Sequence, residues 1–306
     1  VVAPHVVYRQ RSRAGFAIGD DKHIDLVRYV AWLVRERHRP RPQKASGDYE
    51  DMKERARARN ARLSKAGRDI GEIPEVVNQE RLARAQASFR AFCESYFPET
   101  FYLGWSPDHL KVIEKIERAV NEGGLFALAM PRGSGKTTLC EVACLWAVLT
   151  GKREFVALIG SDESHAAEML ESIKTELECN ELLLADFPAA CYPIQCLDGI
   201  ANRCGGQLCG GQRTHIEWTA KQIVLPTIPG SPASGAIINV SGITGRIRGM
   251  KHKRPDGRTV RPSLVILDDP QTDESARSPS QCDQRLSILN GAILGLGGPG
   301  QKISAV

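Results

Sequence analysis

The sequence lacks any apolar stretch long enough to cross a lipid bilayer. Its longest uninterrupted apolar run, Val142 to Leu149, has eight residues, whereas a membrane-spanning helix needs about 20. It also lacks the charged, apolar and small-residue regions of a secretory leader. These absences exclude an integral membrane protein, and we expect no membrane partner.

Aromatic residues are few, at 6%, and no internal repeat is visible. The other proportions of the 306 residues are ordinary, with 42% hydrophobic and 25% charged side chains. They are typical of a globular protein and unlike those of disordered or collagen-like chains. At about 150 residues per domain, the length indicates two units, or one large unit with an appendage.

Nine cysteines without a leader indicate a reducing cytoplasm rather than a secreted disulfide scaffold. Four of them follow the pattern C-x4-C-x7-C-x4-C, which could hold zinc if a loop folded back on itself. Structural zinc ligands usually have a longer middle segment, so buried free thiols are the stronger expectation. The four are Cys191, Cys196, Cys204 and Cys209.

The net charge of +5 is unevenly distributed, because residues 1–70 carry 17 basic and 9 acidic side chains. A basic end suggests a polyanionic partner, although solvated helices are an equal alternative. We expect helices over Ile24–Arg37, over about 51–65, and from an N-cap at Asn78 to about Tyr96. Together they predict a basic helical appendage at residues 1–95.

Apolar runs and helical segments alternate over residues 96–306. Ser106 and Pro107 start a helix that extends to about Val120, and Ser161 is expected to cap a later one. This alternation predicts an α/β fold with a parallel central sheet flanked by helices. The other expected helices cover 137–149, 163–178 and 278–294; the expected strands cover 125–130, 155–159, 215–218, 222–225, 236–240 and 264–267; and 199–212 is a loop or hairpin.

A glycine-containing segment joins the apolar run 125–130 to the next helix. A phosphate-binding loop needs exposed backbone N–H groups, a helix N-terminus, a lysine for the β and γ phosphates and a hydroxyl for Mg²⁺. The pattern G-x4-G-K-[ST] is incomplete, because Met130 takes the place of the first glycine, and a chance glycine-rich turn is the alternative. The predicted nucleotide-binding residues are Pro131, Arg132, Gly133, Ser134, Gly135, Lys136, Thr137 and Thr138.

Two carboxylates follow the apolar run 264–267. A nucleoside triphosphatase needs one carboxylate for Mg²⁺ and one to orient or deprotonate the attacking water. Asp268, with Thr137, is the predicted metal ligand, and Asp269 is the predicted base. Glu274 or Asp273 could take the base role instead. An ordinary Asp-Asp-Pro turn is the alternative for the whole segment.

Three segments, taken in combination and order, resemble the ATPase half of phage large terminase subunits, the motors that drive double-stranded DNA into procapsids. They are P-R-G-S-G-K-T-T at 131–138, G-R-I-R-G at 245–249 and L-V-I-L-D-D-P-Q at 264–271. The resemblance covers roughly residues 97–306. It implies a RecA-like P-loop ATPase domain that uses ATP and Mg²⁺ in the cytoplasm of a bacterial host.

The resemblance also implies roles for arginines. The family places one in the phosphate loop, matched here by Arg132, on the γ-phosphate. It offers another to a neighbouring subunit's nucleotide, for which Arg248, or less well Arg246, fits. A guanidinium can neutralise charge on the γ-phosphoryl oxygens without proton transfer. The predicted catalytic residues are Asp269, Arg132, Lys136 and Arg248.

Two departures limit the resemblance. Where many members read adenine with a glutamine, this chain has His109, for which a simple surface role is an equal interpretation. The family's C-terminal nuclease half has no counterpart before Val306, so we expect no nuclease activity from this chain. Val1 in place of Met indicates a fragment or a processed chain. Ser304 resembles a residue that links hydrolysis to movement. The implied partners are double-stranded DNA, a small terminase subunit, a portal or procapsid, and further copies of this chain in a ring.

The stretch from Arg246 to Arg261 contains seven basic residues against Asp256. Residues 251–261 could form a solvated hairpin or a loop that contacts DNA phosphates. No aromatic residue is interleaved, so stacking on single-stranded bases is not expected. The alternatives to a packaging motor are another P-loop DNA translocase or helicase-like ATPase, and a nucleotide-binding assembly module with little turnover.

Overall fold

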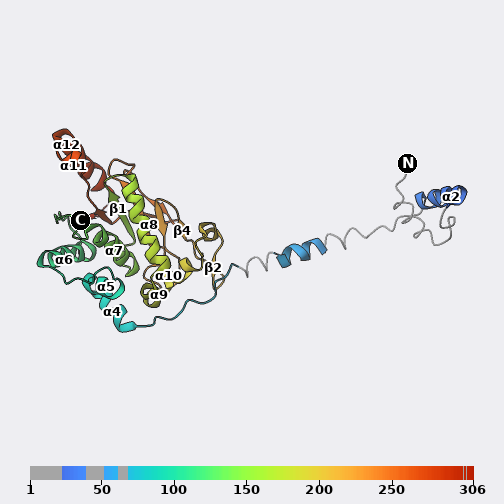
Figure 1. The fold of residues 1–306 in the computed structure, drawn as a ribbon, viewed down its shortest axis with the longest axis horizontal. Coiled ribbons are helices and arrows are strands. Elements are labelled where there is room, and N and C mark those ends of the chain that lie inside the picture. Colours follow the sequence, from blue (N-terminus) through green and yellow to red (C-terminus); the bar gives the residue numbers. More distant parts are fainter. Residues whose placement is uncertain (1–22, 39–51, 61–67, 299, 301) are drawn as a thin grey trace. The chain divides into compact units, whose positions relative to one another are not determined.

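The structure, a computed structural model, describes residues 23–38, 52–60, 68–298, 300 and 302–306. The chain divides into two compact units, Val1–Leu63 and Ser64–Val306. This division lies earlier in the chain than the boundary expected at residue 95. Helices α4 (Gln79–Ala87) and α5 (Phe89–Tyr96), expected in the appendage, therefore belong to the second unit (Figure 1).

The first unit contains helix α2 (Leu26–Arg37), capped by the Asp25 carboxylate, and a helix at 52–60. The apolar stripe of α2 is exposed, whereas Trp32 is buried. Every residue of 52–60 is exposed, as its lack of an apolar face predicts. The remaining parts of the helix expected over 51–65 lie outside the described residues.

A six-stranded sheet organises the second unit, in the order β10-β9-β1-β6-β5-β4. Strands β10 (Ser304–Ala305), β9 (Leu264–Leu267), β1 (Phe155–Gly160) and β6 (Ile237–Gly242) are parallel, and β5 (Gln222–Val224) and β4 (Glu217–Trp218) add antiparallel pairs at one edge. Gly160 pairs with Gly242, and Ile159 with Leu267. The carboxyl ends of the parallel strands β9, β1 and β6 therefore lie at the same end of the sheet.

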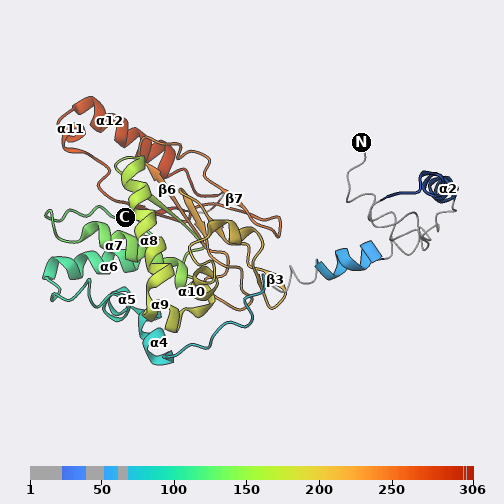
Figure 2. The same cartoon turned by 45° about the vertical axis from the view of Figure 1, so that its right-hand side comes forward.

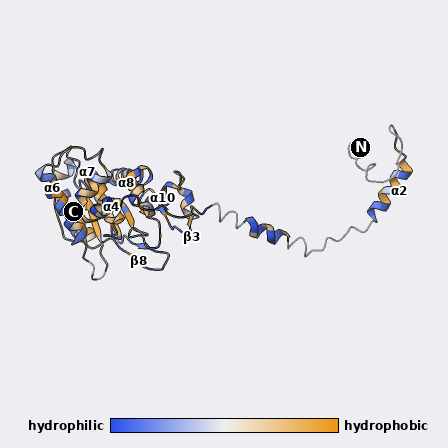
Figure 3. Ribbon diagram, turned by 90° about the horizontal axis from the view of Figure 1, so that it is seen from below, coloured by the Kyte–Doolittle hydropathy of each residue, from blue (hydrophilic) through white to orange (hydrophobic). Residues whose placement is uncertain are grey.

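Alternate residues of β1 face two hydrophobic layers. Val156 and Leu158 pack with α7 (Lys136–Leu149) and α8 (Glu163–Cys179), which lie side by side in Figure 2. Ala157 and Ile159 pack against the π-helical turn Leu289–Ile293 (η2), which follows α12 (Pro279–Ile288). Figure 3 shows hydrophobic segments in the interior of this unit. The mixed α/β class and the mostly parallel sheet agree with the sequence analysis.

The helix expected from Asn78 to Tyr96 is two helices. Asn78 caps α4 as predicted, but Ser88 has extended backbone, accepts from Ala91 N and begins α5. Both helices join the core, where Phe89 and Phe92 are buried and the Trp146 indole donates to Ala85 O. The predicted start at Ser106 and Pro107 is confirmed by α6 (Pro107–Asn121).

The strand expected over 125–130 is wrong in this structure. Leu125 forms a single bridge with Ala305, and Phe126 N donates to Ala305 O. Residues 127–130 have no strand partner among the described residues. The segment still connects α6 to α7 beside the sheet.

Shorter elements complete the second unit. Helices α9 (Glu181–Asp186) and α10 (Pro188–Gln195) were not expected from the sequence. The 3-10 turn Ala201–Gly205 and the hairpin of β2 (Leu208–Cys209) and β3 (Gln212–Arg213) confirm an excursion over 199–212. A second hairpin pairs β7 (His252–Lys253) with β8 (Thr259–Val260), and α11 spans Asp273–Ala276.

The zinc hypothesis for the four clustered cysteines is not supported. Among the described residues, which include all four, no group of three or more His, Cys, Asp or Glu side chains could hold a metal ion. Cys191 is buried in α10, and its burial raises the pKa of the thiol to about 12. In the described part of the chain, no helix is long and apolar enough to cross a membrane.

Candidate functional site

The predicted phosphate loop and the first turn of α7 occupy residues 131–138. Gly133 and Gly135 both have a φ of 76°, a left-handed conformation that glycine adopts without strain. Gly135 is the N-cap of α7, and no side chain in the described part of the chain caps that terminus. The first backbone N–H groups of a helix have no partner within it, so this terminus can bind an anion.

Thr137 and Asp268 meet at the carboxyl end of β9. The Thr137 hydroxyl donates to Asp268 Oδ2 at 2.6 Å, across 131 residues of sequence. Asp268 is only 2% exposed, because it ends a buried strand beside α7. The structure therefore brings together the two predicted metal ligands.

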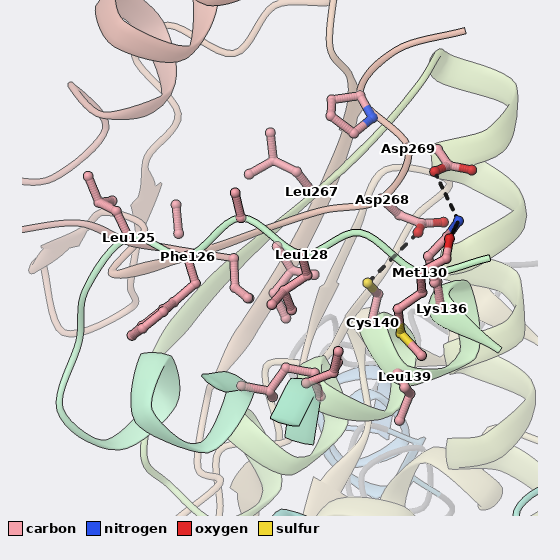
Figure 4. A pocket seen from close by; sticks show the side chains of 18 of the residues that line it. Leu125, Phe126, Leu128, Met130, Lys136, Leu139, Cys140, Leu267, Asp268 and Asp269 are labelled. Atoms are coloured by element: carbon pink, nitrogen blue, oxygen red, sulfur yellow. Dashed lines mark hydrogen bonds and ion pairs between the residues drawn. The ribbon is translucent and has the colours of Figure 1, made fainter. Parts of the chain in front are cut away.

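Lys136 and Asp269 lie next to this pair (Figure 4). Lys136 Nζ lies 3.7 Å from Asp269 Oδ1 and donates to Met130 O at 3.1 Å. Asp269 has a φ of 42°, a conformation that costs energy for a residue with a Cβ. Its side chain is 63% exposed, in contrast to its buried neighbour. The strained turn thus directs one carboxylate inward and presents the other to solvent.

His165 contacts the same carboxylate, and the sequence analysis missed it. Its Nε2 lies 3.3 Å from Asp268 Oδ2, and its Nδ1 lies 3.3 Å from Ser161 Oγ. A carboxylate only accepts, so Nε2 carries a proton and donates to Asp268. The signal available in the sequence was a polar cluster directly after the buried strand β1, at the edge where β9 also ends.

The N-terminus of α8 approaches the sheet closely and thereby places His165. Asp162, not Ser161 as expected, is the N-cap and accepts from His165 N at 2.9 Å. A Cβ on Gly160 would lie 3.2 Å from His165 Nδ1 and 3.0 Å from Ala166 N. A larger residue at this position would therefore displace α8 or the imidazole.

Two further groups from α7 lie near Asp268. Cys140 Sγ is 3.9 Å from Asp268 Oδ1, and burial raises the pKa of this thiol well above its usual value, so it stays protonated. Glu141 accepts from Ser172 Oγ on α8 at 2.8 Å. Burial, with a smaller contribution from the Asp268 charge, raises the pKa of Glu141 to about 7.

His109 is attached to the phosphate loop, which corrects its interpretation as a simple surface residue. Its Nε2 lies 3.0 Å from Ser134 O and its Nδ1 lies 2.7 Å from Ser106 Oγ. Because a carbonyl oxygen only accepts, Nε2 carries the proton and Nδ1 accepts from the hydroxyl. The N-cap of α6 thus fixes a ring that holds the loop. Contact of His109 with adenine stays a prediction.

A cavity of about 410 Å³ lies beneath the loop, between residues 125–130 and β9. Leu125, Phe126 and Leu128 line one end, whereas Lys136, Asp268 and Asp269 lie at the other (Figure 4). Only the second end has groups that bind phosphate or metal. Phosphates are therefore expected there rather than in the apolar part.

The other predicted side chains are those of three arginines and two acidic residues. The exposed arginines are Arg132, Arg246 and Arg248. Arg246 and Arg248 lie on the loop after β6, at the end of the sheet where β1 and β9 also end. Neither Arg246 nor Arg248 has an ion pair among the described residues. Glu274 is exposed on α11, and the side chain of Asp273 lies outside the described features.

The donor set fits a nucleotide phosphate with Mg²⁺. An uncapped helix terminus and Lys136 suit phosphate oxygens, and the Thr137 hydroxyl and Asp268 carboxylate suit Mg²⁺, which takes its other ligands from phosphate and water. A scan against known protein families finds no match, and a search among curated proteins finds no similar sequence. The functional argument therefore depends on the residues and their geometry.

Proposed function

We propose that this chain is a Mg²⁺-dependent ATPase with a RecA-like P-loop fold. The observation that carries the proposal is the 2.6 Å hydrogen bond from Thr137 to Asp268, with Lys136 beside it. It joins the phosphate loop to the end of a neighbouring strand, the arrangement that P-loop enzymes use to hold the metal of MgATP. A chance glycine-rich turn would not require this contact.

Each residue of the site has a role in this proposal. The backbone of 133–138, with Lys136 and Arg132, binds the phosphates. Thr137 and Asp268 hold Mg²⁺, which when bound neutralises phosphate charge. Asp269 is exposed, so it can reach a water molecule and orient or deprotonate it. His165 and Cys140 orient the Asp268 carboxylate.

We further propose that the ATPase drives double-stranded viral DNA into a procapsid, as the resemblance to large terminases implies. Hydrolysis then takes place in a ring of copies, with Arg248 offered to the neighbouring nucleotide. The exposure of Arg248 on a loop at the site's edge supports this role. The small terminase subunit and the portal are the implied partners, in the cytoplasm of a bacterial host.

An ATPase assay with and without duplex DNA tests the proposal. We expect slow hydrolysis that requires Mg²⁺ and is stimulated by DNA or portal. Lys136→Ala should lower the rate at least about 100-fold, because it removes a cation from the developing phosphoryl charge. Lys111→Ala is the matched control, since Lys111 is exposed on α6 and its single ion pair among the described residues is with Asp108 at 3.1 Å.

The alternatives give different results in the same experiments. Tight ATP binding without hydrolysis, even with DNA and portal, would contradict the motor and favour an assembly module. DNA-stimulated hydrolysis with separation of the two strands would favour a helicase-like enzyme. Equal activity of the Lys136→Ala variant and the wild type would remove the P-loop assignment.

A further inference from the structure

A basic cleft lies away from the phosphate loop, at the antiparallel side of the sheet. The β7–β8 hairpin and the segment 204–217 line a cleft of about 500 Å³. Arg213, His215, His252, Lys253 and Arg254 contribute to its walls. The proposed ATPase chemistry uses none of these residues.

The pleat of the hairpin separates its inner and outer side chains. His252 pairs with Val260 in the antiparallel register. Both face the sheet, since His252 Nδ1 lies 3.2 Å from Gln222 Nε2 and Val260 packs against the cluster around Phe155. Side chains alternate along a strand, so Lys253 lies on the outer face. The same alternation, continued by one residue beyond each strand, places Lys251 and Arg261 on that face.

The basic side chains form two classes by their partners. Arg254 is held by Glu154 at 2.7 Å and Gly235 O at 2.8 Å, and Arg258 is held by Asp256 at 2.8 Å. These arginines anchor and shape the hairpin. A second set has no ion pair among the described residues and consists of Arg213, Lys251, Lys253 and Arg261.

Acidic groups do not neutralise this second set. The cleft contains two carboxylates, Glu217 and Asp256. Asp256 is paired with Arg258, whereas Glu217 accepts from the uncharged Gln222 Nε2 at 2.7 Å and keeps its negative charge. One unpaired carboxylate against the four cations of the second set leaves a net positive charge that favours a polyanion. We call the hairpin members of this set, Lys251, Lys253 and Arg261, the basic face.

We infer that the basic face binds the phosphate backbone of double-stranded DNA. Among the described residues, no Phe, Tyr or Trp side chain lines the cleft, so it lacks the large aromatic platforms on which the bases of a single strand stack. Lysine and arginine side chains that contact phosphates, and not base edges, bind DNA independently of its sequence. A translocating enzyme requires binding of this kind. The choice of DNA rests on the proposed function, whereas the position of the face depends only on the hairpin.

Anisotropy of a labelled duplex of about 30 base pairs, titrated with the whole chain between about 50 and 200 mM salt, tests the inference. The variant Lys251→Gln/Lys253→Gln/Arg261→Gln should bind at least about 10-fold more weakly at low salt. The slope of log K against log salt concentration should become shallower by about 3, because each lost phosphate contact removes about one unit. A misfolded protein would not produce this defined change of slope.

The matched control removes three positive charges elsewhere. Arg90, Lys111 and Arg118 on α5 and α6 each pair with an acidic neighbour. The variant Arg90→Gln/Lys111→Gln/Arg118→Gln should keep the affinity and slope of the wild type. If both triple variants lose affinity equally, or neither loses any, the inference is overturned. Polyglutamate that competes as well as duplex DNA at equal charge would overturn the assignment to a nucleic acid.

The same variants separate this inference from the proposed function. The basic-face variant should hydrolyse ATP like the wild type in the absence of DNA, because none of its substituted residues lies in the phosphate loop. If the chain hydrolyses no ATP but the basic-face variant has a shallower slope of log K against log salt concentration, the ATPase is contradicted and the basic face is supported. If the chain hydrolyses ATP but the basic-face variant keeps the salt slope of the wild type, the ATPase is retained and DNA binds another surface.

Discussion

The Asp268 carboxylate receives contacts from two helices besides its own strand. Thr137 and Cys140 reach it from α7, and His165 reaches it from α8. A ligand that is held from several sides loses little freedom when it binds a metal, so its partners affect metal affinity. The sequence identified the α7 hydroxyl and the carboxylate by their motifs, but His165 belongs to no motif that the sequence analysis used.

His165→Ala should weaken Mg²⁺ binding without abolishing the fold. The variant removes the Nε2 donor from Asp268, so the Mg²⁺ concentration needed for half-maximal ATP binding should rise about 10-fold. A fluorescent ATP analogue titrated at several Mg²⁺ concentrations measures this shift at equilibrium. His165→Gln, whose amide can still donate to the carboxylate, should recover part of the loss. Unchanged Mg²⁺ dependence in the alanine variant would show that the contact does not position Asp268.

Glu141 makes stability depend on pH. Burial raises its pKa from 4.5 to about 7 in the folded protein, so the folded state keeps the proton to higher pH than the unfolded chain. Its contribution to the free energy of unfolding is complete below about pH 4.5 and is lost as the pH rises through about 7. Glu141→Gln keeps an acceptor for Ser172 but cannot ionise.

The free energy of unfolding of the wild type should therefore fall relative to Glu141→Gln as the pH rises. Between about pH 5 and pH 8 we expect a relative loss of about 1 to 2 kcal/mol, because the site is partly exposed to solvent. Urea unfolding at both pH values measures it. Glu168→Gln, at an exposed position on α8, should follow the wild type. Parallel pH profiles for the Glu141 variant and the wild type would contradict this assignment.

Helix ends show where local sequence was sufficient and where it was not. Asn78 and the Ser106–Pro107 pair cap their helices through contacts within three residues, so the sequence predicted both starts. The break at Ser88 depends on Glu117 of α6, which accepts from Ser88 Oγ at 3.0 Å and from Phe89 N at 2.6 Å. Ser88 also caps α5 locally by accepting from Ala91 N, but the Glu117 contact, 29 residues away, has no local pattern.

Glu117→Ala should destabilise the second unit by about 1 to 2 kcal/mol, since it leaves the N-terminus of α5 without its carboxylate partner. Chemical denaturation measures the loss, and Glu117→Gln should retain part of the stability because its amide oxygen still accepts. Glu114→Ala, at an exposed position on the same helix, should change stability by less than about 0.5 kcal/mol. Equal losses at both positions would exclude a specific cap.

The strand expected over 125–130 illustrates another limit of sequence. The run is apolar and of suitable length, but strand formation also requires a neighbouring strand to supply hydrogen bonds. Leu125 and Phe126 find one at Ala305, whereas the rest of the run lines the cavity beside β9. Strands β1, β6 and β9 were predictable because each is a short apolar run that is followed by a turn, and in the structure each one is buried and paired with a neighbouring strand.

On the scale of the whole molecule, the division between Leu63 and Ser64 separates two kinds of sequence. The second unit contains the sheet, the phosphate loop and the basic face, and its buried Asp186 binds the Arg81 guanidinium, Asn78 N and the Tyr96 hydroxyl. Those contacts tie α4 and α5 to α9, near the start of the unit. The excess of basic over acidic side chains lies instead in residues 1–70. The contacts that stabilise the second unit and most of the excess positive charge therefore lie in different parts of the chain.

A chain that begins at Ser64 should therefore keep its fold and its chemistry while losing part of its attraction for DNA. Its melting temperature should lie within about 2 °C of that of the second unit in the full chain, because no core residue of that unit is removed. Its ATPase rate without DNA should be unchanged. Its slope of log K against log salt concentration should be shallower, since basic side chains of the N-terminal region are absent. If the full and shortened chains have the same slope while the basic-face variant still has a shallower slope, the N-terminal charges do not contact DNA. The DNA contact of the proposed motor then lies within the second unit.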